Sequence, residues 1–132
     1  GDFEKALEAN ARASAIYREL ADEPRDLKCI TQRGFIYCER YGQMKHQSDL
    51  GSAHSAFREA GIKAESFRRP EQLAESFEGS GDLKIIEGNF AGGREYLKKA
   101  AIIYRRIGSR EKANRVLVKL KRLPFYSRRL VR

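Results

Sequence analysis

The segment Ala13-Ser14-Ala15-Ile16-Tyr17-Arg18-Glu19-Leu20 returns 87 residues later as Ala100-Ala101-Ile102-Ile103-Tyr104-Arg105-Arg106-Ile107. Residues 1–20 align on residues 88–107 without a gap, and a shorter copy, with Ala53, Phe57 and Gly61, lies between them. An alanine, an aromatic residue and a small residue spaced four apart share one face of a helix. Because one helix type recurs three times, at steps of 40 and 47 residues, the sequence predicts stacked helical hairpins.

The helices between these copies also resemble one another, because Pro24, Leu27 and Gly42 align with Pro70, Leu73 and Gly88 at an offset of 46 residues. A proline suits the first turn of a helix, and a glycine suits its C-terminal turn, which we expect at Gly42, Gly61, Gly88 and Gly108. No sustained alternation of apolar and polar residues indicates a strand. The sequence therefore predicts an all-α fold of six helices, near residues 2–21, 24–41, 48–60, 70–87, 90–107 and 110–122.

Glycines inside the fourth predicted helix and a proline after the last one affect the expected helix boundaries. Gly79 and Gly81 fall inside the fourth helix, where each glycine costs about 1 kcal/mol relative to alanine, so its continuity is left open. Pro124 is expected to end the last helix, since proline lacks the backbone N–H that a helix interior uses. We therefore predict a helical-repeat domain over residues 1–123 and a basic aromatic tail over residues 124–132.

Charge is unevenly distributed along the chain of 132 residues, which has a net charge of +9. Residues 94–132 hold 14 Lys and Arg against 2 acids, whereas residues 1–93 hold 13 against 16. This asymmetry favours a partner with an acidic surface, although a solvated helix face explains it equally well. No apolar run is long enough for a membrane span, no secretory signal is found, and two cysteines are too few for a disulfide scaffold. These features predict an intracellular, cytoplasmic protein.

The repeats resemble a known family. Gly1-Asp2-Phe3-Glu4-Lys5-Ala6 resembles the start of the second helix of a tetratricopeptide repeat, and Ile30, Gly34 and Tyr37 resemble the bulky, small and aromatic positions of its first helix. The repeats here are longer than that family's, and Tyr104–Ala113 is similar to the repeats of the soluble NSF attachment protein group. The resemblance implies a right-handed α-solenoid whose first helices line a peptide-binding groove. Gly93 departs from the family pattern, which has alanine there.

No catalytic, cofactor-binding or metal residue is predicted, and no cofactor. His46, Asp49 and His54 form the best metal-like group, but spacings of three and five do not place both histidines on one helix face. Ser52 and Ser55 flank His54 without an acid to orient it, which argues against a nucleophile and base. Cys29 and Cys38 are typical of small core residues.

We therefore predict a non-enzymatic scaffold or adaptor that binds a peptide or partner helix in the groove or at the basic C-terminal end. By the resemblance, the groove residues include Glu75, Glu78 and Asp82, an acidic set unlike the family's clamp for C-terminal carboxylates. The predicted partner-binding residues are Lys28, Thr31, Phe35, Arg115, Lys119, Arg122, Arg128 and Arg129.

The alternative is a nucleic-acid-binding module that acts through the basic C-terminal helix and tail. Phe125 and Tyr126 would stack on bases beside arginines that contact phosphates, and binding would weaken with salt. The sequence leaves open the identity of the partner, the oligomeric state and whether the chain belongs to a longer repeat array.

Overall fold

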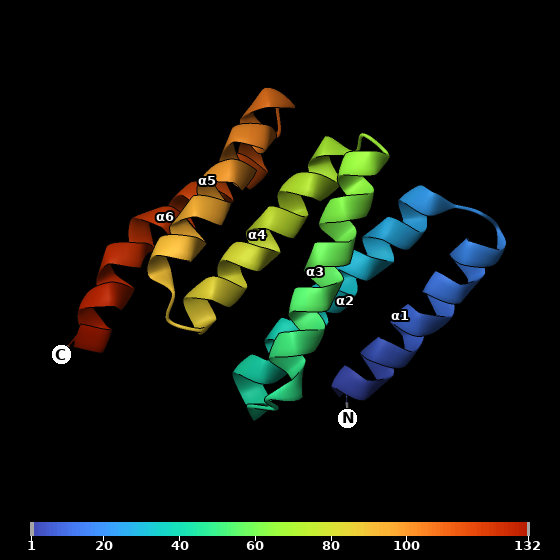
Figure 1. Ribbon diagram of the computed structural model, residues 1–132, viewed down its shortest axis with the longest axis horizontal. Helices are drawn as coiled ribbons and strands as arrows, with labels where there is room; N and C mark the ends of the chain where they lie inside the picture. The colour runs from blue at the N-terminus through green and yellow to red at the C-terminus, as the bar shows by residue number, and fades with distance from the viewer. Residues whose placement is uncertain (1, 132) are drawn as a thin grey trace.

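The computed structural model describes residues 2–131, with side chains described for residues 2–124. Six α-helices and no strand occur in these residues, so the predicted all-α fold of stacked helical hairpins is confirmed (Figure 1). The helices are α1 (Asp2–Glu19), α2 (Glu23–Met44), α3 (Ser48–Ser66), α4 (Pro70–Ile86), α5 (Phe90–Arg106) and α6 (Arg110–Val131).

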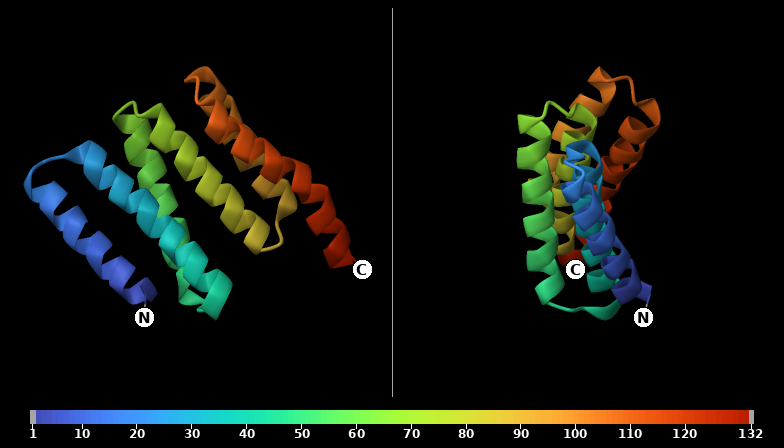
Figure 2. Two further views of the ribbon diagram at one scale, coloured as in Figure 1. Left: turned by 180° about the vertical axis from the view of Figure 1, so that it is seen from behind. Right: turned by 90° about the vertical axis from the view of Figure 1, so that its right-hand side faces the viewer.

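Helix α4 occupies the centre of the array. It packs against α3 on one side and α5 on the other, and it also contacts α2 (Figure 1). The view from behind shows α1, α2, α4 and α6 following one another across the molecule (Figure 2, left). No residue from Glu71 to Ile85 is exposed, although this stretch contains four acidic residues. The polar side chains of α4 therefore point into contacts with other helices or into partly covered hollows.

Local chemistry sets most of the helix ends where the sequence predicts them. The side chains of Asp22 and Asn89 accept hydrogen bonds from backbone N–H groups in the first turns of α2 and α5. Pro70 begins α4, where its missing N–H is not needed. Gly88 and Gly108 adopt φ angles of +84° and +77°, which a residue with a Cβ rarely adopts. These glycines are the predicted turns after α4 and α5.

Helix α3 is longer than predicted, because Gly61 does not end it. The helix continues to Ser66, and Gly61 lies against α4, where an added Cβ would be 3.1 Å from Ser76 Oγ. Gly42 likewise lies inside α2, which ends at Met44, followed by Lys45 in the left-handed conformation. Both predictions were wrong because a glycine inside a helix looks, in sequence, like one that ends a helix.

Helix α4 is continuous through Gly79 and Gly81, which answers the question that the sequence left open. Both glycines permit close approach to neighbouring helices: Gly81 lies against Leu97 and the backbone of Gly93 on α5. The N-cap residues of α2 and α4 are Asp22 and Arg69. The two helices therefore correspond at an offset of 47 residues, not at the 46 used to align their sequences. At that offset Gly34 corresponds to Gly81.

Helix α6 extends beyond its predicted end near residue 122. It continues to Val131 with Pro124 inside it, so residues 124–131, predicted as a tail, prolong the helix (Figure 2). Proline removes one backbone hydrogen bond and crowds the preceding turn. Leu123, fully buried in the core cluster that α5 and α6 share, anchors the turn that precedes the proline. The tail side chains after Pro124 lie outside the described ones.

The ring of Phe57 on α3 fills a slot between two glycines. A Cβ added at Gly34 on α2 would lie 2.6 Å from Phe57 Cε1, and one at Gly79 on α4 would lie closer still. Phe57 is 1% exposed, and the ring of Phe35 meets it edge-on at 4.9 Å between centroids. Because a glycine lies on each side, the ring is held closely between the backbones of α2 and α4.

We predict that Gly79→Ala destabilises the fold although alanine is the better helix former. The added methyl group overlaps the clamped ring of Phe57, and overpacking of this kind costs about 1–3 kcal/mol, against roughly 1 kcal/mol gained in helix propensity. Urea unfolding followed by circular dichroism measures the difference. Gly51→Ala is the matched control, since a Cβ there meets nothing within 4 Å and is expected to stabilise α3. Equal stabilisation by both changes would contradict the clamp.

Candidate binding groove

Helices α2, α4 and α6 border a hollow of about 580 Å³, here called the α2–α4–α6 groove. A further hollow of about 480 Å³ adjoins it and shares Phe35, Asp82 and Lys119. The first hollow is lined by Lys28, Thr31, Gln32, Phe35, Glu75, Glu78, Asp82, Lys112, Arg115 and Lys119. The second adds Cys38, Glu39, Ile85, Ile86 and Arg122.

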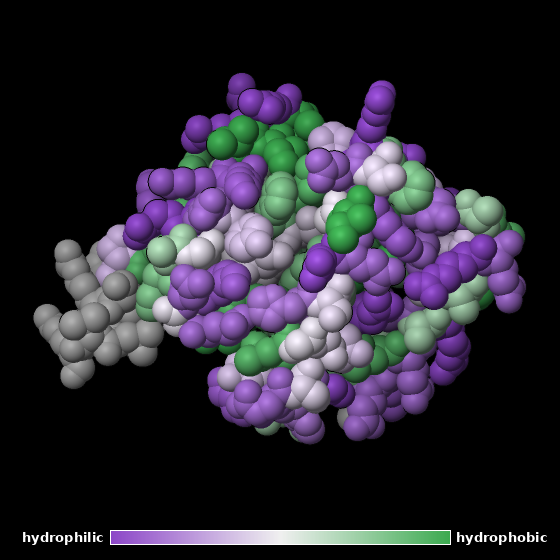
Figure 3. Space-filling view, viewed as in Figure 1, coloured by the Kyte–Doolittle hydropathy of each residue, from purple (hydrophilic) through white to green (hydrophobic). Residues whose placement is uncertain are grey.

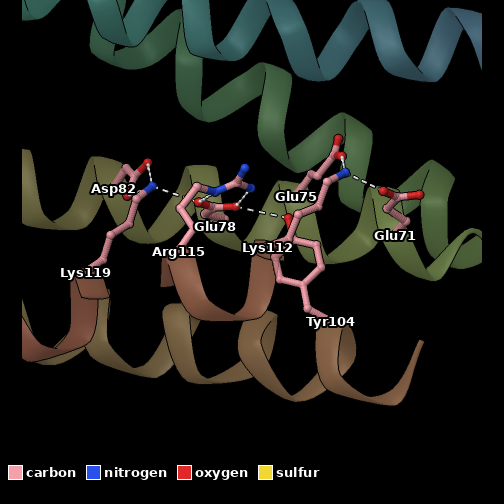
Figure 4. Close-up of polar contacts among 8 residues, drawn as sticks. All are labelled: Glu71, Glu75, Glu78, Asp82, Tyr104, Lys112, Arg115 and Lys119. Carbon is pink, nitrogen blue, oxygen red and sulfur yellow. Dashed lines mark hydrogen bonds and ion pairs between the residues drawn. The ribbon is translucent and has the colours of Figure 1, made fainter. Parts of the chain in front are cut away.

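The wall between α4 and α6 is made of ion pairs, here called the α4–α6 network (Figure 4). Its acids lie on one face of α4, spaced four, three and four residues apart, and its bases lie on α6 at a similar helical spacing. The members are Glu71, Glu75, Glu78, Asp82, Lys112, Arg115 and Lys119. Lys112 bonds to Glu71 and, at 3.0 Å, to Glu75, so each end of the network is held by a lysine that spans two acids.

Glu78 is the centre of this network. Arg115 donates two hydrogen bonds to it, from Nε at 2.9 Å and from Nη2 at 2.6 Å, and Lys119 Nζ donates a third at 2.8 Å. Tyr104 Oη on α5 donates a fourth, at 3.0 Å. Glu78 is 2% exposed, so burial raises its pKa, but the bonds from Arg115 and Lys119 outweigh burial and leave the pKa below its ordinary value.

Asp82 shows the opposite balance. Burial raises its pKa, and the attraction of Lys119, although it acts the other way, does not compensate. Burial lowers the pKa of Lys119, but Asp82 and Glu78 together raise it above its ordinary value. Burial and the nearby Glu78 charge raise the pKa of the Tyr104 hydroxyl. The pairing thus favours the charged forms of Glu78 and Lys119, whereas burial disfavours the charged form of Asp82.

The structure brings together most of the predicted partner-binding residues. Lys28, Thr31, Phe35, Arg115 and Lys119 line the first hollow, together with the acidic set predicted on α4. Thr31 is buried and donates its hydroxyl to the Leu27 carbonyl at 3.1 Å, so this hydroxyl is already bonded within α2. Arg115 and Lys119 are already paired with acids and are not free cations.

The remaining predicted residues lie at or beyond the edge of the groove. Arg122 lines the second hollow and forms no ion pair among the described side chains. The same holds for Lys28 in the first hollow. Arg128 and Arg129 lie outside the described side chains.

Sequence reasoning missed how the charges pair. The offset between partners was a usable signal, because Glu75 and Lys112, Glu78 and Arg115, and Asp82 and Lys119 are each 37 residues apart. A constant offset between an acidic and a basic stripe of matching spacing indicates two helices in register. The apolar residues of the second hollow, Cys38, Ile85 and Ile86, carried no comparable signal.

The metal-like group of the sequence does not come together. Asp49 is buried and receives two hydrogen bonds from Arg40, at 2.9 and 2.6 Å, which fix the start of α3 to the end of α2. His54 pairs with Glu87, and His46 lies exposed in the loop before α3. Within the described part of the chain, no three potential ligands are placed to hold a metal ion.

Neither cysteine is placed for nucleophilic chemistry. Burial, with the nearby charges of Asp82 and Glu39, raises the pKa of Cys38 to about 12, and burial also raises the pKa of Cys29. A thiol in this state carries little thiolate at neutral pH.

Two further findings bear on function. Of the helices in the described residues, none is long and apolar enough to cross a membrane. No family model, no curated protein and no solved structure matches the chain.

We predict that Glu78→Gln costs about 1–3 kcal/mol at pH 7, less than a fully buried pair because Arg115 is half exposed. The pKa of Glu78 is lower in the fold than in the unfolded chain, so its contribution is fully present above its ordinary value of 4.5 and is lost as the pH falls below it. The cost of the substitution should shrink over that range. Urea unfolding at a series of pH values measures it.

Asp82→Asn is the matched control. Because the fold raises the pKa of Asp82 above 3.8, folding disfavours its ionised form, and this destabilising contribution sets in as the pH rises above 3.8. Replacing it should therefore cost less at pH 7 than replacing Glu78. Equal costs, or a Glu78→Gln cost that does not fall with acid, would contradict the assignment of Glu78 as the centre of the network.

Proposed function

We propose that this chain is a non-enzymatic protein-interaction module, built from tetratricopeptide-like repeats, that holds a peptide or a helix of a partner protein in the α2–α4–α6 groove. The observation that carries the proposal is the register of the lining. At an offset of 47 residues Lys28, Thr31 and Phe35 of α2 correspond to Glu75, Glu78 and Asp82 of α4, and both sets line one hollow. Corresponding positions of successive hairpins thus contribute to one surface, which is the usual basis of binding by repeat proteins.

The lining offers complementary features for a polypeptide. Phe35, Ile85 and Ile86 provide an apolar area in the second hollow, and Ile86 is 42% exposed. Lys28 and Arg122 supply positive charges that form no ion pair in the described part of the chain. A ligand with an apolar side chain and carboxylates on either side of it would satisfy both features without disrupting the α4–α6 network.

The state of the ionisable groups favours binding over acid–base chemistry. A general acid or base works best with a pKa close to the working pH. The pKa of Glu78 is lowered by its partners and that of Tyr104 is raised by burial, so both shifts lead away from neutrality. Burial raises the pKa of Asp82, but Lys119 bonds to both oxygens of that carboxylate. The charges of the groove are therefore suited to fixing the orientation of a ligand.

Selection of random peptides of about twelve residues against the protein, followed by fluorescence anisotropy of the enriched ones, tests the proposal. We expect Lys28→Glu with Arg122→Glu to weaken binding at least about tenfold, or roughly 1.4 kcal/mol. Both residues are exposed, so the fold should tolerate the change.

The matched control is Arg105→Glu with Arg106→Glu, which makes the same change of charge at the exposed C-terminal end of α5. Binding of the enriched peptides should remain within about twofold of the unmodified protein. Equal losses from both double variants would mean that net charge, rather than the groove, attracts the peptides. Absence of enriched peptides would count against the proposal directly.

A nucleic-acid-binding role is the second candidate, and one observation favours it. Eight exposed basic side chains on α5 and α6 form no ion pair with a described acid: Arg94, Lys98, Lys99, Arg105, Arg106, Arg110, Lys121 and Arg122. The network weakens this candidate, because it neutralises the other three basic residues of α6 before Pro124. Binding would then be driven by phosphates and would depend on salt.

We expect any such binding to depend on α6. Titration of a fluorescent single-stranded RNA between about 50 and 200 mM salt gives the slope of log K against log salt. Arg110→Gln with Lys121→Gln should reduce that slope by about 0.7 for each phosphate that is no longer neutralised. Lys5→Gln with Arg12→Gln on α1 is the control of equal charge. No binding at the lowest salt removes this candidate.

A further inference from the structure

Another hollow, also of about 580 Å³, lies on the opposite side of α4, between α3 and α5. We call it the α3–α4–α5 groove, and it belongs to the side of the molecule shown in Figure 3, where hydrophobic and hydrophilic residues are interspersed. Its lining is formed by His54, Ser55, Phe57, Arg58, Gly61, Ile62, Glu65, Leu73, Ser76, Phe77, Ser80, Lys84 and Tyr96.

The hollow exists because its floor lacks bulk. Gly61, Ser76 and Ser80 are small, and the hydroxyl of Ser76 is already bonded to the Leu73 carbonyl at 2.7 Å. The Ser76 hydroxyl therefore needs no hydrogen bond from a ligand. Around it are large apolar side chains, among which Ile62 is 61% exposed.

The charges of this groove differ from those of the α2–α4–α6 groove. Arg58 on α3 and Lys84 on α4 line it together with one acid, Glu65 near the end of α3, and none of the three forms an ion pair with any described side chain. The nearby acid Glu87 is already paired with His54. Lys84 is only partly exposed and has no opposite charge beside it among the described side chains. A carboxylate from a ligand would supply that charge.

We infer that the α3–α4–α5 groove docks an acidic amphipathic helix of a partner protein. A helix satisfies its own backbone hydrogen bonds, whereas an extended peptide needs donors and acceptors from the groove walls. Those walls are helices whose backbones are already bonded internally, and their small hydroxyls are few. An apolar face of the partner helix would fill the hollow above Ser76 and Ser80, and its carboxylates would pair with Arg58 and Lys84.

The length of the groove fits this mode of binding. Along α3 the lining residues His54, Arg58, Ile62 and Glu65 follow one another at steps of four, four and three. This span covers about 16 Å at 1.5 Å per residue, or roughly three turns. A partner helix would therefore insert three apolar side chains at helical spacing, with its acids where Arg58 and Lys84 lie.

Three synthetic helical peptides test the inference. They share one leucine face of three turns and differ only in the polar face, which carries Glu, Gln or Lys. Fluorescence anisotropy with the full chain should show the tightest binding for the Glu peptide. Arg58→Glu with Lys84→Glu should weaken the Glu peptide at least about tenfold, or roughly 1.4 kcal/mol, and reverse the order, so that the Lys peptide binds best.

Two uncharged variants test the apolar part. Ser80→Trp fills the hollow, and Ile62→Gln removes an exposed apolar contact with little risk to folding, which circular dichroism monitors. Each should weaken all three peptides several-fold. Lys28→Glu with Arg122→Glu is the charge-matched control in the other groove and should leave binding within about twofold. This control also separates the inference from the proposed function, which requires those two residues.

Any of three results would overturn the inference. The first is equal weakening by the two double charge reversals, which would indicate general attraction to a basic protein. The second is unchanged binding in Ile62→Gln together with a folded Ser80→Trp. The third is an absence of binding by the Glu peptide at every protein concentration tested, up to the solubility limit of the protein.

Discussion

The position of Phe57 between Gly34 and Gly79 is the constraint on which the rest of the array depends. The ring lies where α2, α3 and α4 meet, so one side chain on the second helix of a hairpin fixes the helices before and after it. The alanines that surround it on α3, such as Ala56 and Ala60, pack against α2 and let the helices approach closely. The two grooves follow from this geometry, because the same close contact that fixes α3 on α4 determines which faces of α4 remain partly open.

The α4–α6 network accounts for part of the positive charge of residues 94–132. In sequence this region is strongly positive, but three of its bases compensate acids of α4, and Glu78 alone receives bonds from Arg115, Lys119 and Tyr104. The acidic first part and the basic last part of the chain are thus partly matched to each other. The cations that remain for partners are those at other positions, among them Lys28, which lies at the α2 side of the groove.

Local features were predictable and tertiary ones were not. Gly88 and Gly108 could be assigned from sequence because a positive φ after an amphipathic stretch is a local requirement. Gly61 could not, since its small size matters only against Ser76 on another helix. The resemblance to tetratricopeptide repeats implied much of the lining of the α2–α4–α6 groove, but its ion pairs depended on the register of residues 37 positions apart. The α3–α4–α5 groove had no sequence signal, because it arises from missing bulk.

The absence of an exposed residue between Glu71 and Ile85 has a consequence for the motions of the molecule. Amide hydrogens exchange with solvent through local opening, and opening is most costly where a helix is covered by its neighbours. Helix α4 can unwind only by breaking its packing on α3 and α5 and releasing the buried carboxylate of Glu78 from its partners. It should therefore be the last segment to exchange, and a ligand in either groove would act on the part of the chain that already moves least.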